Sequence, residues 1–113
     1  MTLYAFDGAS GRSYDYALLN QKSRAAFPMS AGSYVFVRQA GSALKIICAG
    51  ETESIWNVFV STHLWETAKN QYGATAAYIH LNPDPSARRM EISDLVKRHE
   101  PPMNVTAHVQ NAS

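Results

Sequence analysis

Four basic side chains fall near the two ends of one expected helix, and cations so placed could bind phosphate. They are Arg88, Arg89, Lys97 and Arg98. Arg88 and Arg89 lie in the first turn, where their charge opposes the helix dipole, an arrangement that sometimes marks a phosphate-contacting patch. The alternative is a solvated face on which these cations pair with Glu91 and Asp94. A patch of this size predicts weak, salt-dependent binding of nucleic acid.

An aromatic row near the N-terminus is a second candidate for chemistry. Its members are Tyr4, Phe6, Tyr14 and Tyr16, which flank a segment dense in turn formers. Paired across a hairpin, these rings could form a platform on which nucleic-acid bases stack. The alternative is that they complete the hydrophobic core. We favour the core, because Arg12 is the only cation interleaved with the row.

Histidine and cysteine side chains could support catalysis or bind metal. His63 could act as a base or contact phosphate, or it could begin a helix and make only local hydrogen bonds. His80 and His99 lack ligand spacing, such as two histidines one helical turn apart, and Cys48 is the only thiol. We therefore expect no structural zinc site. Cys48 is interpreted as a small buried apolar residue.

A β-hairpin in the middle of a sheet is the element expected to position these residues. Residues 34–38 and 44–49 are rich in aromatic and β-branched side chains and flank a short segment that contains glycine. Odd and even positions of each run should separate onto opposite faces, so Cys48 should share a face with Ile46 and not with Ile47. Both faces are largely apolar, which predicts helices on both sides of the sheet.

The remaining elements complete an α/β protein of the α+β type, with a small central antiparallel β-sheet flanked by helices. They are an extra N-terminal β-hairpin over 3–6 and 13–18, a helix from Glu53 capped by Thr52, a helix over 63–72 ended by Gly73, a strand over 74–81, and a helix over 84–99. The buried stripe of the last helix is predicted to comprise Ile92, Leu95, Val96 and His99.

Length and composition predict one folded domain over 1–104, with 1–28 as hairpin and connector, 29–104 as core and 105–113 as a flexible tail. The chain of 113 residues is 46% hydrophobic and 17% charged, which argues against disorder. Its net charge of +1 predicts neither nucleic-acid nor membrane binding from bulk charge. No signal peptide or membrane span is expected, and with the lone cysteine this favours the cytoplasm and no membrane partner.

Several short motifs occur in order between residues 29 and 104. They are Gly32-Ser33-Tyr34, Cys48-Ala49-Gly50-Glu51-Thr52, His63-Leu64-Trp65-Glu66-Thr67-Ala68, Gly73-Ala74-Thr75, Ile79-His80-Leu81, and Asp94-Leu95-Val96-Lys97-Arg98-His99-Glu100-Pro101-Pro102-Met103-Asn104. Taken together, their order and spacing resemble the GIY-YIG nuclease superfamily. The resemblance implies cutting of a phosphodiester with one divalent metal ion, Mg²⁺ or Mn²⁺, held by hard oxygen ligands.

The resemblance also implies roles for single residues. Tyr34 matches the tyrosine that activates water in the related nucleases, and Gly50 matches the glycine that lets the backbone approach the site, with Gly32 as a second structural position. Cys48 stands where a second tyrosine is expected and Trp56 where an arginine is expected. A phenolic oxygen and a guanidinium fork are therefore missing.

Three further positions complete the comparison with the superfamily. His63 matches a histidine common to the nearer relatives. The metal-ligating glutamate falls on Ile92, so Glu91 is one residue early, which is a rotation of about 100° on a helix. Glu91 would then lie at the flank of the buried stripe. Asn104 matches a terminal asparagine that could hold the site or tie down the chain end.

Three functions follow from these observations. The favoured one is a catalytically degenerate GIY-YIG-like domain that retains at most weak binding of DNA, because catalytic groups act as a unit and the loss of one is costly. An alternative is an active, metal-dependent endonuclease with a site rebuilt from Tyr34, His63 and Glu91. A third is a small protein–protein interaction module that presents aromatic side chains such as Trp56.

Overall fold

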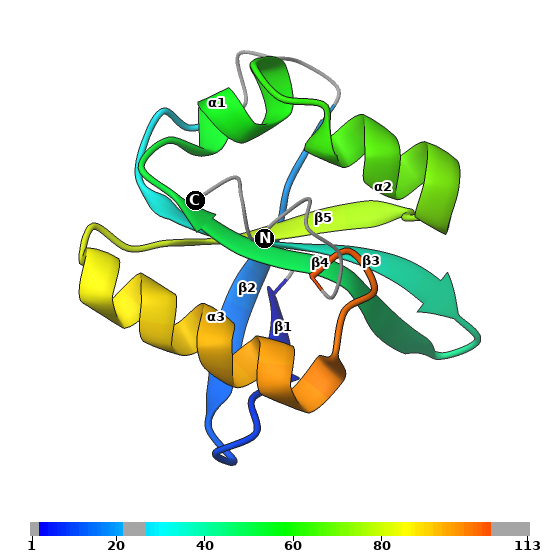
Figure 1. Cartoon of the computed structure of the whole chain (residues 1–113), viewed down its shortest axis with the longest axis horizontal. Helices are drawn as coiled ribbons and strands as arrows, with labels where there is room; N and C mark the ends of the chain where they lie inside the picture. The colour runs from blue at the N-terminus through cyan, green and yellow to red at the C-terminus, as the bar shows by residue number, and fades with distance from the viewer. Residues whose placement is uncertain (1–2, 22–26, 105–113) are drawn as a thin grey trace.

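The chain forms a curled five-stranded antiparallel sheet with helices on both faces (Figure 1). The computed structural model describes residues 3–21 and 27–104. Its elements are β1 (Leu3–Asp7), β2 (Ser13–Leu18), β3 (Gly32–Ala40), β4 (Ala43–Thr52), α1 (Ile55–Val60), α2 (Leu64–Tyr72), β5 (Ala76–Leu81) and α3 (Pro85–His99). The strand order is β1-β2-β5-β3-β4, and every neighbouring pair is antiparallel. The architecture is therefore α+β.

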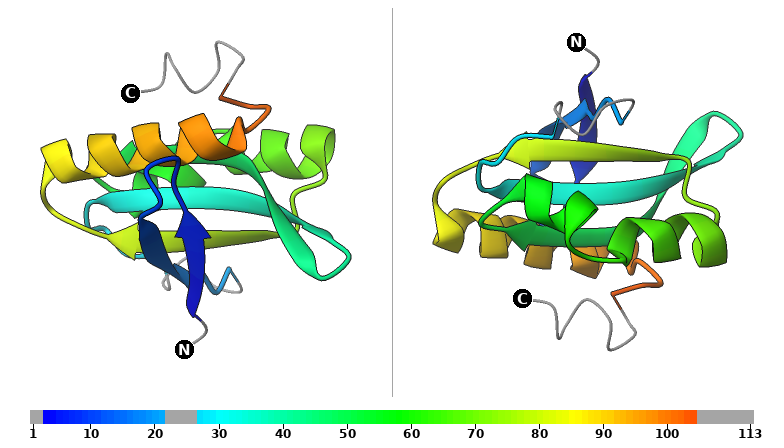
Figure 2. Two further views of the ribbon diagram at one scale, coloured as in Figure 1. Left: turned by 90° about the horizontal axis from the view of Figure 1, so that it is seen from below. Right: turned by 90° about the horizontal axis from the view of Figure 1, so that it is seen from above.

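The sheet separates two layers of helices (Figures 1 and 2). On one face, α1 and α2 cover a buried cluster that includes Tyr34, Phe36 and Cys48. On the other face, α3 covers a cluster that includes Tyr16 and Leu95. Strands β3 and β4 are apolar on both faces because each face is buried, as the sequence predicted.

The β3–β4 hairpin contains a bulge that the sequence did not predict. Phe36 pairs with Cys48, but the next residue, Val37, pairs with Ile46, so Ile47 is an extra residue in β4. The bulge places Ile47 in the cluster beneath α1 and α2 with Cys48, and Ile46 in the cluster beneath α3. The simple alternation predicted for this strand is therefore wrong. Strand β4 is also an edge strand and not a central one.

The β1–β2 hairpin is confirmed, and it joins the same sheet through β2 and β5. Tyr4 lies opposite Tyr16, and Phe6 lies opposite Tyr14. Phe6 and Tyr16 are buried, whereas Tyr4 and Tyr14 are partly exposed, so two of the four rings complete the core. Only two residue pairs connect β2 to β5. Side-chain contacts must therefore provide much of what holds the β1–β2 hairpin to the rest of the sheet.

Local capping groups set the ends of the first helix. The hydroxyl of Ser54 accepts a hydrogen bond from the backbone N–H of Asn57, so α1 begins two residues later than the predicted start at Glu53. Thr52 still belongs to β4. Its hydroxyl accepts from the N–H of Ser54, which makes it part of the turn and not the helix cap.

The other helix ends agree with the predictions. Gly73 follows α2 in the left-handed conformation, with φ 74°. The side chain of Asp84 caps α3 by accepting from the N–H of Ser86, and α3 ends at His99. Residues 22–26 of the predicted connector and the predicted flexible tail at 105–113 lie outside the described residues.

The buried face of α3 differs from the predicted stripe. Leu95 is buried as expected, but Ile92, Val96 and His99 are only partly buried. Two charged residues take their place, since Arg88 is 1% and Glu91 5% exposed. Apolar periodicity could not predict this rotation, because it depends on partners that the sheet offers to the two charges. Within residues 3–21 and 27–104, no helix combines the length and apolar content needed to cross a membrane.

Candidate functional site

A row of polar side chains crosses the sheet beneath the N-terminal half of α3. Ser33 on β3 lies opposite both Glu51 on β4 and His80 on β5. Tyr16 on β2 continues the row, with its ring centroid 5.6 Å from that of His80. Because side chains alternate along each strand, all four residues lie on the face that α3 covers.

Glu91 of α3 is bonded to two members of this row. Its carboxylate accepts a hydrogen bond from the Tyr16 hydroxyl, and both carboxylate oxygens lie 3.1 Å from Nδ1 of His80. Burial, and then the nearby Glu91 charge, raise the pKa of Tyr16 well above its usual value, so this phenol stays a donor. The side chain of His80 is 35% exposed. Glu91 was predicted at the flank of the buried stripe, but its side chain is buried between α3 and the sheet.

Arg88 has a buried position that the sequence did not predict. Its guanidinium donates to Glu51 at 2.8 Å, to Glu53 at 2.7 Å and to the carbonyl oxygen of Asn82 at 2.9 Å. The hydrogen bond with Glu51 is the largest cause of the raised pKa of Arg88. Arg88 thus connects α3 to the end of β4 and the loop after β5. It does not belong to a phosphate-contacting surface, and it does not pair with Glu91 or Asp94.

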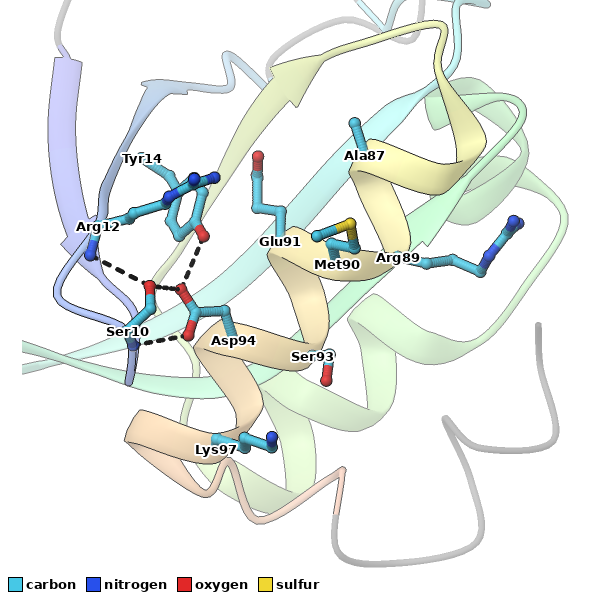
Figure 3. Close-up of a pocket in the computed structure, with 10 residues that line it drawn as sticks. All are labelled: Ser10, Arg12, Tyr14, Ala87, Arg89, Met90, Glu91, Ser93, Asp94 and Lys97. Atoms are coloured by element: carbon cyan, nitrogen blue, oxygen red, sulfur yellow. Dashed lines mark hydrogen bonds between the residues drawn. The ribbon is translucent and has the colours of Figure 1, made fainter.

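An open groove of about 680 Å³ lies between α3 and the turn of the β1–β2 hairpin (Figure 3). Three cations line it, Arg12 from the hairpin and Arg89 and Lys97 from α3. Within the described part of the chain, none of the three forms an ion pair. Arg98 is exposed on α3 but does not line this groove. Two of the four predicted phosphate contacts therefore share one concave surface with an arginine from the hairpin.

Asp94 joins the hairpin to α3 at the floor of the groove (Figure 3). Its carboxylate accepts the backbone N–H of Ser10 at 2.8 Å, the Ser10 hydroxyl at 2.6 Å and the Tyr14 hydroxyl at 2.7 Å. These hydrogen bonds lower the pKa of Asp94, so the carboxylate stays ionised to lower pH than an exposed aspartate does. A Cβ atom at Gly8 would overlap the Asp94 carboxylate, so glycine permits this close approach.

Acidification should loosen this attachment. The pKa of Asp94 is lower in the folded than in the unfolded chain, so its contribution to stability is complete above about pH 4 and is lost as the pH falls through the folded value. We expect the melting temperature to fall on acidification in the wild type. Asp94→Asn should melt lower at neutral pH but show a flatter dependence below pH ~4. Parallel melting curves against pH for the two proteins would contradict the role of Asp94.

Tyr34 and Cys48, the two residues matched to superfamily tyrosines, lie on the opposite side of the sheet from the polar row. Tyr34 is buried beneath α1 and α2, and burial is the main cause of its strongly raised pKa, followed by Cys48 and Glu51. Burial likewise raises the pKa of Cys48 to about 12. A Cβ at Gly50 would overlap the Tyr34 ring, and one at Gly32 would lie 2.8 Å from the carbonyl oxygen of His80. Both glycines thus permit close packing around β3.

The remaining matched residues do not meet at one site. His63 is exposed at the start of α2, with no capping hydrogen bond from its side chain, and Trp56 is partly buried on α1. Asn104 bonds the backbone of Ala49 twice, with Oδ1 accepting at 2.8 Å and Nδ2 donating at 2.7 Å. Asn104 therefore ties the chain end to the edge strand β4. Glu91 lies across the sheet from all of the residues beneath α1 and α2.

The side chains present do not fit the divalent metal that the resemblance implies. Ile92 occupies the ligand position and has no donor atom, while the oxygens of Glu91 already contact Tyr16 and His80. In the described segments, no three His, Cys, Asp or Glu side chains are grouped to hold a metal ion. Mg²⁺ and Mn²⁺ require several oxygen ligands in defined geometry. We therefore assign no metal site.

Arg12 and the two tyrosine–carboxylate pairs are the features that sequence reasoning missed. Tyr14 bonds Asp94, and Tyr16 bonds Glu91. The two tyrosines are two residues apart on a strand, and the two carboxylates are three residues apart on a helix. Each spacing places both side chains of a pair on one face of its element, so the two pairs can meet. Both spacings were visible in the sequence, but their use required knowing that β2 and α3 are neighbours.

Comparisons with known proteins add no assignment. No family model, curated protein or solved structure matches this chain. The functional proposal therefore depends on the groove and on the positions of the residues around it.

Proposed function

We propose that this chain is a GIY-YIG-like domain that has lost its nuclease centre and binds nucleic acid through the groove between α3 and the β1–β2 hairpin. The observation that carries the proposal is a set of three groove cations, none of which forms a close salt bridge within the described residues. Arg12, Arg89 and Lys97 line one concave surface, and no described carboxylate lies within ion-pair distance of them. A cation without a protein partner is free to neutralise a phosphate.

The carboxylates of the groove offset only part of this attraction. Glu91 is 5% exposed, and its charge is directed toward Tyr16 and His80. Asp94 is directed toward donors of Ser10 and Tyr14, and its charge also interacts with that of Arg12. The cations, by contrast, are held on long side chains that reach solvent. The outward-facing charge of the groove is therefore mainly positive, although the net charge of the chain is only +1.

Loss of cutting is supported by the positions of the matched residues. Cys48 and Trp56 replace a phenol and a guanidinium, and the one retained tyrosine, Tyr34, is buried on the face opposite Glu91. Neutral, buried Tyr34 is unsuited to proton transfer with water because its pKa is strongly raised. The arginine that would stabilise charge on the phosphoryl oxygens is also missing, because Trp56 stands at its expected position.

Salt-dependent binding tests the proposal. Fluorescence anisotropy of labelled DNA and RNA should give weak binding whose logarithm falls linearly with the logarithm of salt concentration. Each phosphate contact contributes a slope of about 0.7 to 0.9, so the triple variant Arg12→Ala, Arg89→Ala, Lys97→Ala should lose about two units of slope. The matched control is Arg38→Ala, Lys45→Ala, which removes exposed cations of the β3–β4 hairpin. Equal slopes for wild type and triple variant would overturn the proposal.

Incubation with plasmid DNA and Mg²⁺ or Mn²⁺ separates the proposal from an active endonuclease. We expect the plasmid to stay uncut by any activity that depends on a divalent metal ion, so adding a chelator should change nothing. Robust cutting that disappears in both Tyr34→Phe and Glu91→Gln would instead support the endonuclease. Concentration-dependent sedimentation without any affinity for nucleic acid would support the interaction module.

A further inference from the structure

If the groove binds nucleic acid, as proposed above, its size and its lining residues indicate which kind of nucleic acid it prefers. We infer that the groove binds one or two nucleotides of a single strand and prefers bases that carry an exocyclic amino group. The inference depends on three properties of the lining: its volume, the separation of its cations, and the acceptor capacity of Asp94.

Volume favours an unstacked base. About 680 Å³ lies in the range of pockets that hold small ligands, which is roughly 300 to 1,000 Å³. The hairpin turn forms one wall and α3 forms the other (Figure 3). We infer that a base enters between these walls after it leaves its stack. Single strands splay bases at little cost, whereas a duplex must break pairing and stacking first.

The cations are spread over α3 and the hairpin, with the Arg89 side chain pointing away from the hairpin, so they can contact different phosphates of one strand (Figure 3). Arg89 and Lys97 are eight residues apart on α3, which is about 12 Å along the helix axis. Arg12 comes from the hairpin wall (Figure 3). Two surfaces suited to stacking also line the groove, the half-buried ring of Tyr14 and Met90, whose side chain is 70% exposed.

Asp94 supplies the preference among bases. An ionised carboxylate has about four acceptor sites, and the two donors of Ser10 and the Tyr14 hydroxyl occupy three of them. One acceptor site therefore remains, and the hydrogen bonds from Ser10 and Tyr14 lower the pKa of the carboxyl group. Cytosine, adenine and guanine can donate to it from an amino group, whereas the one ring donor of thymine, N3–H, lies between two oxygen acceptors that the carboxylate repels.

The first experiment compares oligonucleotides on the wild-type chain. Anisotropy titrations at about 50 mM salt use dC, dA and dT tracts of equal length and one mixed-sequence strand, alone and as a duplex. We expect the single strand to bind more tightly than its duplex, and dC and dA tracts to bind about tenfold more tightly than the dT tract. A duplex that binds as tightly as its strand, or a dT tract that binds as tightly as dC, would overturn the inference.

A pair of variants isolates the ring of Tyr14. Tyr14→Phe and Tyr14→Leu both remove the hydrogen bond to Asp94, but only Tyr14→Phe keeps an aromatic surface. We expect Tyr14→Leu to bind a dC tract about tenfold more weakly than Tyr14→Phe, with both melting at similar temperatures. Equal affinities of the two variants would overturn stacking on this ring. If no oligonucleotide binds even at low salt, the proposed function itself fails, whereas binding of all oligonucleotides alike defeats only the inference about the ligand.

Discussion

Arg88→Met should lower the free energy of unfolding by about 3 kcal/mol. The substitution removes the guanidinium but keeps an unbranched side chain of similar length, so the change reports mainly on the polar contacts of Arg88. Breaking a buried ion pair costs about 3 to 5 kcal/mol, because the partner is left without its counter-charge. We expect the lower end of that range, since Glu51 is 18% exposed and can regain water, while Glu53 at 80% exposure contributes little.

The matched control for Arg88 is the next residue on the helix. Arg89→Met replaces an exposed arginine of the same turn and should change stability by less than about 0.5 kcal/mol. Urea unfolding of the three proteins gives both values, with unchanged slopes as the sign that the folded state is otherwise intact. If Arg88→Met loses no more stability than Arg89→Met, the buried ion pairs do not stabilise the fold as described.

Glu91→Ala should cost about 2 to 4 kcal/mol, because it removes a buried acceptor and leaves a hole beneath α3. The hydroxyl of Tyr16, which is fully buried, would lose the carboxylate that it donates to, and His80 would lose its partner. Glu91→Gln keeps an acceptor oxygen and the volume, and should cost less than half as much. Hydrogen exchange should accelerate first in β1 and β2, because their pairing with the rest of the sheet is short.

A double-mutant cycle tests whether Glu91 acts through Tyr16. Tyr16→Phe removes only the hydroxyl, and the coupling energy between it and Glu91→Ala should be about 1 to 3 kcal/mol. Val35→Ala, on the same face, controls for general loosening of the core and should be additive with Tyr16→Phe. Additive effects of Tyr16→Phe and Glu91→Ala would show that the phenol–carboxylate bond contributes nothing to stability.

Most elements of this fold were predictable because local chemistry specifies them. The hairpin of β3 and β4 follows from aromatic and β-branched runs around a glycine-containing turn. Gly73 ends α2 and Asp84 begins α3, because a left-handed residue and a side-chain acceptor satisfy the backbone at helix ends. These signals extend over three or four residues, so one amino-acid sequence is enough to detect them.

The rotation of α3 was not predictable in the same way. Apolar spacing pointed to Ile92 and Val96, whereas Arg88 and Glu91 are the residues that face the sheet. Burying a charge is favourable only where a partner is already in place, and the partners here come from other strands. Glu51 is 37 residues from Arg88, and Tyr16 is 75 residues from Glu91. No local pattern carries that information.

The amino-acid sequence by itself determined the strands, the helices, and the residues at which α2 ends and α3 begins. Tertiary structure alone decided that Tyr34 and Glu91 lie on opposite faces, that Arg88 is buried, and that Arg12 shares a groove with Arg89 and Lys97. The physical reason is range. Secondary structure depends on torsions and neighbours along the chain, whereas a site depends on which distant side chains the packed sheet and helices bring within hydrogen-bonding distance.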